Sequence, residues 1–162
     1  GGHVGHFASP YACHDGRPLP CVCGGSGHVE AIASGPAILQ SYLRRTGHSS
    51  VPDTRAVFAM AEAGDATAAE TIRVAAAAAG QAVGGLANIL DPEVVLVSGG
   101  LADAGARWWT PMEAALRAEL LPALSGLPVR PAALGNAAAI TGSARLAFDS
   151  AVHEPAPPSQ RI

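Results

Sequence analysis

All three cysteines of the chain lie within residues 5–30, which read GHFASPYACHDGRPLPCVCGGSGHVE. Two of them are separated by one residue, with one histidine fifteen positions before the first and another five positions after the second. Zinc binds four nitrogen or sulfur ligands in a tetrahedron, and glycines between ligands let the chain turn back tightly. A metal ion bound by residues spread along this segment would hold the whole segment as a loop. The pattern therefore predicts a structural zinc site made by His6, Cys21, Cys23 and His28.

Two alternatives stay open on spacing alone. The segment can be a glycine-rich turn with free thiols, and Cys13 and His14 are rival ligands inside it. An odd number of cysteines, and the strain of a bridge across Cys-X-Cys, argue against a disulfide framework and favour a reducing compartment. Thiolate with imidazole is a borderline-soft ligand set, which favours zinc over magnesium or calcium.

Composition excludes several classes of protein. The 162 residues are 49% hydrophobic and 14% charged, which is typical of one globular domain. Every basic residue except histidine is arginine, and the net charge of −3 predicts no basic face for nucleic acid. The alanine-rich stretches are too short and too weakly apolar to span a bilayer, so we expect a cytoplasmic protein without membrane contact.

Helical patterns occupy much of the first two thirds of the chain. From residue 29 to 45 the pattern is interrupted at Gly35 and Pro36, where Ser34 can cap a second helix. Asp53 or Thr54 can cap a short helix that ends near residue 63. Asp65 can cap a long helix from about 66 to 90, whose small-residue face allows another backbone to approach closely.

The last third predicts strands between helices. Val94–Val97 is an apolar, largely β-branched run and reads as a buried parallel strand, followed by Gly99 and Gly100. A helix comes next whose Trp108, Trp109 and Met112 belong to the core or to a dimer surface, and then a short strand at 129–134. We expect Asn136 to cap a last helix over 137–148 and residues 149–162 to form a disordered tail. This alternation indicates a layered α/β fold with a mostly parallel sheet.

Taken together, these motifs resemble the ROK family of repressors, open reading frames and sugar kinases. That family's pattern is G-E-x-G-H, a loop, C-x-C-G-x-x-G-C-x-E, and a helix near A-S-G. Here the matching segments are GHVGH, CVCGGSGHVE and ASGPAI. Further on, LDPEVVLVSGGLADAG resembles the family's strand and glycine pair, and PAALGNAAAITGSARLA resembles its closing helix.

The resemblance implies an actin/hexokinase-like (ribonuclease H-like) fold, with sugar and ATP bound in a cleft and zinc as a structural ion. It assigns sugar contacts to His6, which would also ligate zinc, and to Glu30. His3 occupies the position of the family's glutamate, so this sugar contact is altered. His28 occupies the position of the family's third cysteine and can still bind zinc. Because ligands of open α/β sheets bind beyond the carboxyl ends of strands, Gly99 and Gly100 are candidate nucleotide contacts.

The family's phosphate-binding D-x-G-x-T loop and catalytic aspartate lie upstream of the zinc motif and are not found in these residues. We therefore expect residues 1–148, with the zinc loop at 5–30, to be the C-terminal portion of a larger protein whose N-terminal lobe precedes it. The isolated chain is predicted to have no kinase activity.

The first functional hypothesis is that the chain forms part of an ATP- and magnesium-dependent kinase for glucose or a related hexose, N-acetylated or not. The second is the sugar-sensing domain of a repressor, with nucleic acid bound only by an upstream winged helix. The third is a zinc-stabilised binding module. The resemblance also implies a homodimer.

Overall fold

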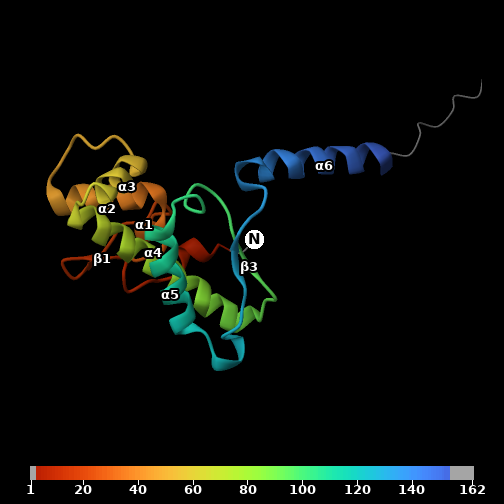
Figure 1. Ribbon diagram of the computed structural model, residues 1–162, viewed down its shortest axis with the longest axis horizontal. Coiled ribbons are helices and arrows are strands. Elements are labelled where there is room, and N and C mark those ends of the chain that lie inside the picture. The colour runs from red at the N-terminus through yellow and green to blue at the C-terminus, as the bar shows by residue number, and fades with distance from the viewer. Residues whose placement is uncertain (1–2, 154–162) are drawn as a thin grey trace, which may run out of the picture.

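The computed structural model describes residues 3–153 of the chain (Figure 1). Its elements, in order, are η1 (Val4–His6), β1 (Cys13–His14), β2 (Arg17–Pro18), α1 (Glu30–Ala33), α2 (Gly35–Thr46), α3 (Thr54–Glu62), α4 (Ala66–Leu90), β3 (Val95–Val97), α5 (Ala106–Glu119), η2 (Pro122–Leu124), β4 (Val129–Pro131), η3 (Gly135–Ala137) and α6 (Ala138–His153). The strands form an antiparallel pair, β1–β2, and a parallel pair, β3–β4. The described chain is thus α/β, with a small parallel sheet and a largely helical body.

The three helix starts that the sequence predicts are confirmed. The Ser34 hydroxyl accepts the N–H of Ala37 at the start of α2, at 3.3 Å. Asp53 caps α3 through the N–H of Ala56, at 2.8 Å. Asp65 caps α4 through the N–H groups of two residues, at 2.8 and 2.9 Å. Each side chain accepts backbone donors that have no partner inside the helix, which is why these helices begin where they do.

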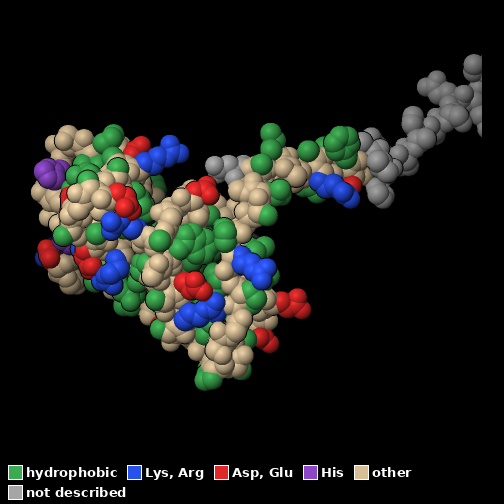
Figure 2. All heavy atoms as spheres, viewed as in Figure 1, with side chains coloured by type: hydrophobic (Ala, Val, Ile, Leu, Met, Phe, Trp, Pro, Cys, Tyr) green, Lys and Arg blue, Asp and Glu red, His purple; other side chains and the backbone are tan. Residues whose placement is uncertain are grey.

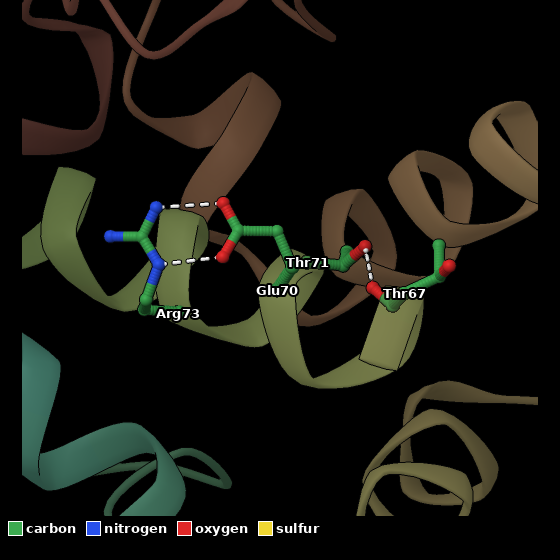
Figure 3. Close-up of polar contacts among 4 residues, drawn as sticks. All are labelled: Thr67, Glu70, Thr71 and Arg73. Atoms are coloured by element: carbon green, nitrogen blue, oxygen red, sulfur yellow. Dashed lines mark hydrogen bonds and ion pairs between the residues drawn. The ribbon is translucent and has the colours of Figure 1, made fainter. Parts of the chain in front are cut away.

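The polar side chains in the first turns of α4 form hydrogen bonds within the helix (Figure 3). Glu70 accepts two hydrogen bonds from the Arg73 guanidinium, both at 2.7 Å, and these bonds lower the pKa of Glu70. Thr71 is only 1% exposed, and its hydroxyl donates to the Thr67 carbonyl at 2.7 Å. The buried face of α4 therefore carries a hydroxyl without leaving it unpaired.

The core lies where α4 packs against α5, with α2 and α3 alongside. A methyl carbon added at Gly80 would lie 2.0 Å from the Met112 carbonyl oxygen, and one at Gly84 would lie 2.6 Å from the Leu116 carbonyl oxygen. The two helix backbones therefore meet directly, as the small-residue face of α4 predicts. Trp108 and Met112 are 4% and 1% exposed, which confirms that they belong to the core.

The parallel pair corrects one expectation. β3 and β4 pair with Val95 opposite Val129 and Val97 opposite Pro131, so the parallel direction is as predicted. The strand is not buried, however, because Leu96 is 61% exposed and its neighbours are only half-buried. Within the described residues β3 pairs with a single strand, β4. A run of β-branched residues predicts that a strand forms, but it does not predict that other elements cover the faces of that strand.

The C-terminal helix begins later than predicted. Residues 135–137 form the 3₁₀ turn η3, so Asn136 lies inside that turn, and α6 starts at Ala138 and continues past residue 148 to His153. α6 projects from the body (Figure 1), and Ile140, Leu146 and Phe148 are each at least 70% exposed. The remainder of the predicted tail, 154–162, lies outside the described residues.

Acidic and basic side chains are interspersed over the face drawn in Figure 2, and that face carries no concentrated positive patch among the described residues. Across residues 3–153, no helix combines the length and the apolar character needed to span a bilayer.

Candidate functional site

The segment before α1 is built on a two-residue hairpin. Asp15 and Gly16 have φ of 48° and 73°, the left-handed pair that an Asp-Gly turn of type I′ requires, and Cys13 pairs with Pro18 across it. The sequence analysis placed these residues in a loop and did not predict a hairpin. The Asp-Gly dipeptide was the signal that would have revealed the hairpin.

Backbone hydrogen bonds then bring the two histidine-bearing ends of the segment together. The Val29 N–H donates to the Phe7 carbonyl and the Ser9 N–H to the Gly27 carbonyl, both at 2.9 Å, and Ala8 and His28 form an antiparallel bridge. This pairing places the chain at residue 6 beside the chain at residue 28. A turn in which Gly24 has φ of 87° carries the cysteines to the same point.

The four predicted metal ligands lie together. One ligand atom from each lies within 4.8 Å of all the others. His6 Nδ1 is 3.6 Å from Cys21 Sγ, and His28 Nδ1 is 3.3 Å from Cys23 Sγ. In a tetrahedron with zinc–nitrogen and zinc–sulfur bonds of normal length, neighbouring ligand atoms are about 3.3–3.8 Å apart. The two nitrogen–sulfur pairs match this spacing, the group as a whole is no wider than 4.8 Å, and the donor chemistry fits a zinc ion with four protein ligands.

Gly25 leaves room for the His28 ring beside the loop. A methyl carbon at Gly25 would lie 2.8 Å from His28 Cε1 and 3.5 Å from Cys23 Sγ. A side chain at this position would meet the tip of the His28 ring, so the imidazole would have to shift. The predicted rivals lie outside that group: the Cys13 thiol donates to the Pro10 carbonyl at 3.3 Å, and His14 lies 3.6 Å from the Asp15 carboxylate.

The three predicted sugar-contacting residues also meet. The rings of His3 and His6 are stacked, with centroids 4.3 Å apart and planes 17° from parallel. Glu30 is the first residue of α1, and a methyl carbon at Gly5 would lie 2.8 Å from Glu30 Oε2 and 3.2 Å from His3 Cε1. Because Gly5 has no side chain, it leaves room for both the carboxylate and the imidazole. His3 is exposed, while His6 and Glu30 are half-buried.

A hollow of about 730 Å³ lies beside these histidines, and we call it the apolar hollow. One wall is the 3₁₀ turn η1 with its flanking residues, and the other is the last turns of α4. Its lining residues are His3, Val4, His6, Phe7, Ala82, Gly85, Leu86, Ile89 and Leu90. Apart from the two histidines it is lined by apolar side chains and glycine.

A second hollow, of about 660 Å³, lies beyond the carboxyl end of β3, and we call it the strand-end hollow. Gly99, with φ of 89°, turns the chain away from the strand, and Gly100 lines the hollow. The first residues of α2 and α3 face it as well. The full lining is Gly35, Thr54, Arg55, Phe58, Gly100, Leu101, Asp103 and Ala104. Sequence reasoning identified the glycines but missed Arg55 and Phe58, which no local motif marks.

A family model described as the ROK family matches residues 1–150. The chain belongs to the ROK family. It is 39% identical over 98 residues to an N-acetylmannosamine kinase of Yersinia pestis (strain Pestoides F), an alignment that covers 60% of this chain and 31% of that protein.

Solved structures of the ROK family have similar folds. The chain matches a ROK hexokinase from Thermus thermophilus with a TM-score of 0.75 and 31% identity, over 94% of this chain and 49% of that one. It matches a ROK family glucokinase from Streptomyces griseus, solved with glucose and AMPPNP, with a TM-score of 0.72 and 26% identity, over 90% and 51% of the two chains. These matches confirm the predicted family and its hexokinase-like fold.

The chain thus spans about a third of the curated relative's length and about half of each solved chain.

Proposed function

We propose that these residues form the sugar-facing side and part of the nucleotide-facing side of an ATP-dependent hexose kinase with a structural zinc ion. The observation that carries the proposal is that His3 stacks on His6, a member of the four-residue ligand group, and that His3 and Glu30 both lie against Gly5. The similarity to a ROK hexokinase and to a ROK glucokinase supports the same reading.

Zinc would be held by the two cysteines and by the Nδ1 atoms of His6 and His28. Four protein ligands leave no open position for water, so the ion would stabilise the loop and would not generate a nucleophile. His6 is only half-buried, and coordination through Nδ1 would leave its Nε2–H free as a rigidly held donor.

The sugar would be bound by complementary groups. Glu30 is an acceptor that can take hydrogen bonds from two hydroxyls, and a bond to a charged group is stronger than one between neutral groups. The His6 Nε2–H would donate to a hydroxyl oxygen. The stacked ring of His3 extends the same surface.

The nucleotide would enter the strand-end hollow. Phe58 offers a ring on which the base can stack, and Arg55 offers a positive charge. Gly100 has no side chain, so the nucleotide can approach the backbone there. The α2 and α3 helices begin at this hollow, and helix N-termini favour phosphate oxygens. ATP bound with Mg²⁺ would supply the transferable γ-phosphoryl group.

We assign no residue of this chain as the base that takes the proton from the attacking hydroxyl. Phosphoryl transfer needs such a group beside the acceptor oxygen. The chain corresponds to about half of its solved relatives, so we propose that the base belongs to sequence outside these 162 residues. The 162 residues by themselves should release no ADP in the presence of sugar.

The test is ADP release by the complete gene product that contains this chain, with ATP, magnesium and a panel of hexoses. Sugar-dependent release establishes the kinase. Sugar binding without release with any hexose, at full zinc occupancy, would favour the alternative of a sugar-responsive regulator. Absence of both binding and release would reject the two together.

A further inference from the structure

A small polar hollow lies between the β1–β2 hairpin and the helices α1 and α2, and we call it the arginine hollow (Figure 1). It shares no residue with the proposed sugar and nucleotide sites. Its enclosed space is about 20 Å³, which is room for one oxygen atom or one water molecule. Its lining residues are Tyr11, Cys13, His14, Leu19, Ile32, Ser41, Arg44 and Arg45. The lining thus contains two arginines and no acidic residue.

The two arginines of the hollow have no carboxylate partner among residues 3–153. Over the same range they form no ion pair, and Arg44 donates to one side chain, the Ser41 hydroxyl, at 2.9 Å. Desolvation, and then repulsion by Arg45, lower the pKa of the Arg44 guanidinium. The pKa of Glu70 is lowered first by its two hydrogen bonds from Arg73, at 2.7 Å, and only last by the charge of Arg45. An anion placed between the two guanidiniums would relieve their repulsion.

Two hydroxyl groups add donors at the same place. Ser41 is 5% exposed and its oxygen accepts from Arg44, but no acceptor in the described part of the chain takes its hydrogen. By contrast, the hydroxyls of Thr46 and Thr71 donate to the carbonyl four residues earlier. The hydroxyl of Tyr11, a half-buried residue, has no hydrogen-bond partner within residues 3–153 either. Because an unused donor in a buried place costs free energy, these hydroxyls favour a ligand with acceptor oxygens.

The other polar residues of the hollow already have partners. The Cys13 thiol donates to the Pro10 carbonyl at 3.3 Å. The His14 ring lies 3.6 Å from the Asp15 carboxylate, which is 87% exposed, so solvent screens its charge. The donors available to a ligand are therefore those of Tyr11, Ser41, Arg44 and Arg45.

We propose that the arginine hollow binds a phosphate group, either inorganic phosphate or the phosphate of a monoester. One oxygen enters the hollow and accepts hydrogen bonds from the Ser41 and Tyr11 hydroxyls, while the two guanidiniums pair with the outer oxygens. A guanidinium has five N–H donors in a planar fork, so Arg44 can keep its bond to Ser41 and still bind the anion. Because the enclosed space holds one oxygen, an ester substituent points into solvent. The hollow therefore recognises the phosphate group and not the molecule that carries it.

This site goes beyond the proposed function and does not depend on it. One wall of the hollow belongs to the hairpin of the segment that carries the four predicted metal ligands, and the opposite wall belongs to α2. A bound phosphate would link the two walls and hold this segment against α2.

The test uses the complete gene product with zinc bound, in which Cys13 reports on the hollow. Cys13 is exposed and lines the hollow, whereas the other two cysteines belong to the ligand group. Inorganic phosphate should slow the alkylation of Cys13 by iodoacetamide, followed by peptide mass spectrometry at constant ionic strength. The phosphate concentration that gives half protection measures affinity at this site, even when phosphate also binds elsewhere.

Matched variants locate the binding. Arg44→Gln and Arg45→Gln should each raise the half-protection concentration about tenfold, because each removes charge-assisted hydrogen bonds. Ser41→Ala should raise it by a smaller factor. Arg130→Gln removes the same charge from β4, outside the hollow, and Arg55→Gln removes it from the strand-end hollow, so both should leave the value unchanged. Equal zinc content and melting temperature show that each variant is folded.

Glucose 6-phosphate in place of inorganic phosphate identifies the source of the ligand, with glucose as the control that lacks the phosphate. Protection of Cys13 by either phosphate supports the site, and the one that protects at the lower concentration is the source. Three results would overturn the inference: no protection by either phosphate, the same half-protection concentration in wild type and Arg44→Gln, or equal protection by glucose. Each of them would leave the kinase proposal intact, and a failure of sugar-dependent ADP release would leave this site intact.

Discussion

Replacing Gly80 with alanine tests the direct packing of α4 against α5. A methyl carbon at this position would lie 2.0 Å from the Met112 carbonyl oxygen and 3.0 Å from the Leu116 amide nitrogen, whereas ordinary contacts begin at 3.4 Å. Both neighbours are backbone atoms, so no side chain can rotate away. α4 and α5 must therefore separate by more than an ångström, which loosens the core around Met112 and Leu116.

The cost follows from two opposing effects. Overpacking against rigid backbone costs about 3 kcal/mol, at the upper end of the usual range. Alanine in place of glycine inside a helix raises the free energy of unfolding by about 1 kcal/mol. Gly80→Ala should therefore lower the free energy of unfolding by about 2 kcal/mol. Gly85 lies on the same helix with nothing within 4 Å of the added carbon, so Gly85→Ala should raise it by about 1 kcal/mol.

Urea denaturation of both variants and wild type, followed by circular dichroism, measures the difference. The reasoning predicts midpoints shifted in opposite directions, with equal slopes. If Gly80→Ala is as stable as Gly85→Ala, the two helices are not in the contact described here, and the packing argument is wrong.

Three further results are expected. The hydrogen bond from the Tyr42 hydroxyl, at 2.6 Å, lowers the pKa of Asp65. The ionised carboxylate therefore stabilises the fold above its unfolded pKa, and this stability is lost as pH falls through the folded pKa. Tyr42→Phe should lower the urea midpoint at pH 7 and make the loss of stability below about pH 4 less steep. Metal analysis should find about one zinc per chain in wild type and in Cys13→Ser, and far less in Cys21→Ser. Phe58→Ala in the complete gene product should raise the KM for ATP about tenfold, with sugar affinity and zinc content unchanged.

Local signals predicted much of this fold because they act through neighbouring residues. Ser34, Asp53 and Asp65 cap helices with their own side chains, so sequence spacing alone identifies the starts of α2, α3 and α4. The ligand pattern lies within one segment, residues 6–28, and the four side chains do come together.

Features that depend on distant segments were predicted less well. The run at Val95–Val97 indicated a strand, but its burial depends on a covering layer that the run does not encode, and Leu96 is exposed. Arg55 and Phe58 reach the strand-end hollow only because α3 packs near the loop after β3. Asn136 resembled a helix cap, yet the chain makes a 3₁₀ turn there before α6 begins.

The most direct test of the central claim is the sugar-dependent turnover of Glu30→Gln in the complete gene product. Glutamine keeps the size of the side chain but loses the charged acceptor, so kcat/KM for the preferred sugar should fall more than about tenfold. Zinc content should stay at one per chain, and Glu93→Gln, on the loop before β3, should behave as wild type. Turnover of Glu30→Gln equal to wild type would contradict the assignment of this site to the sugar.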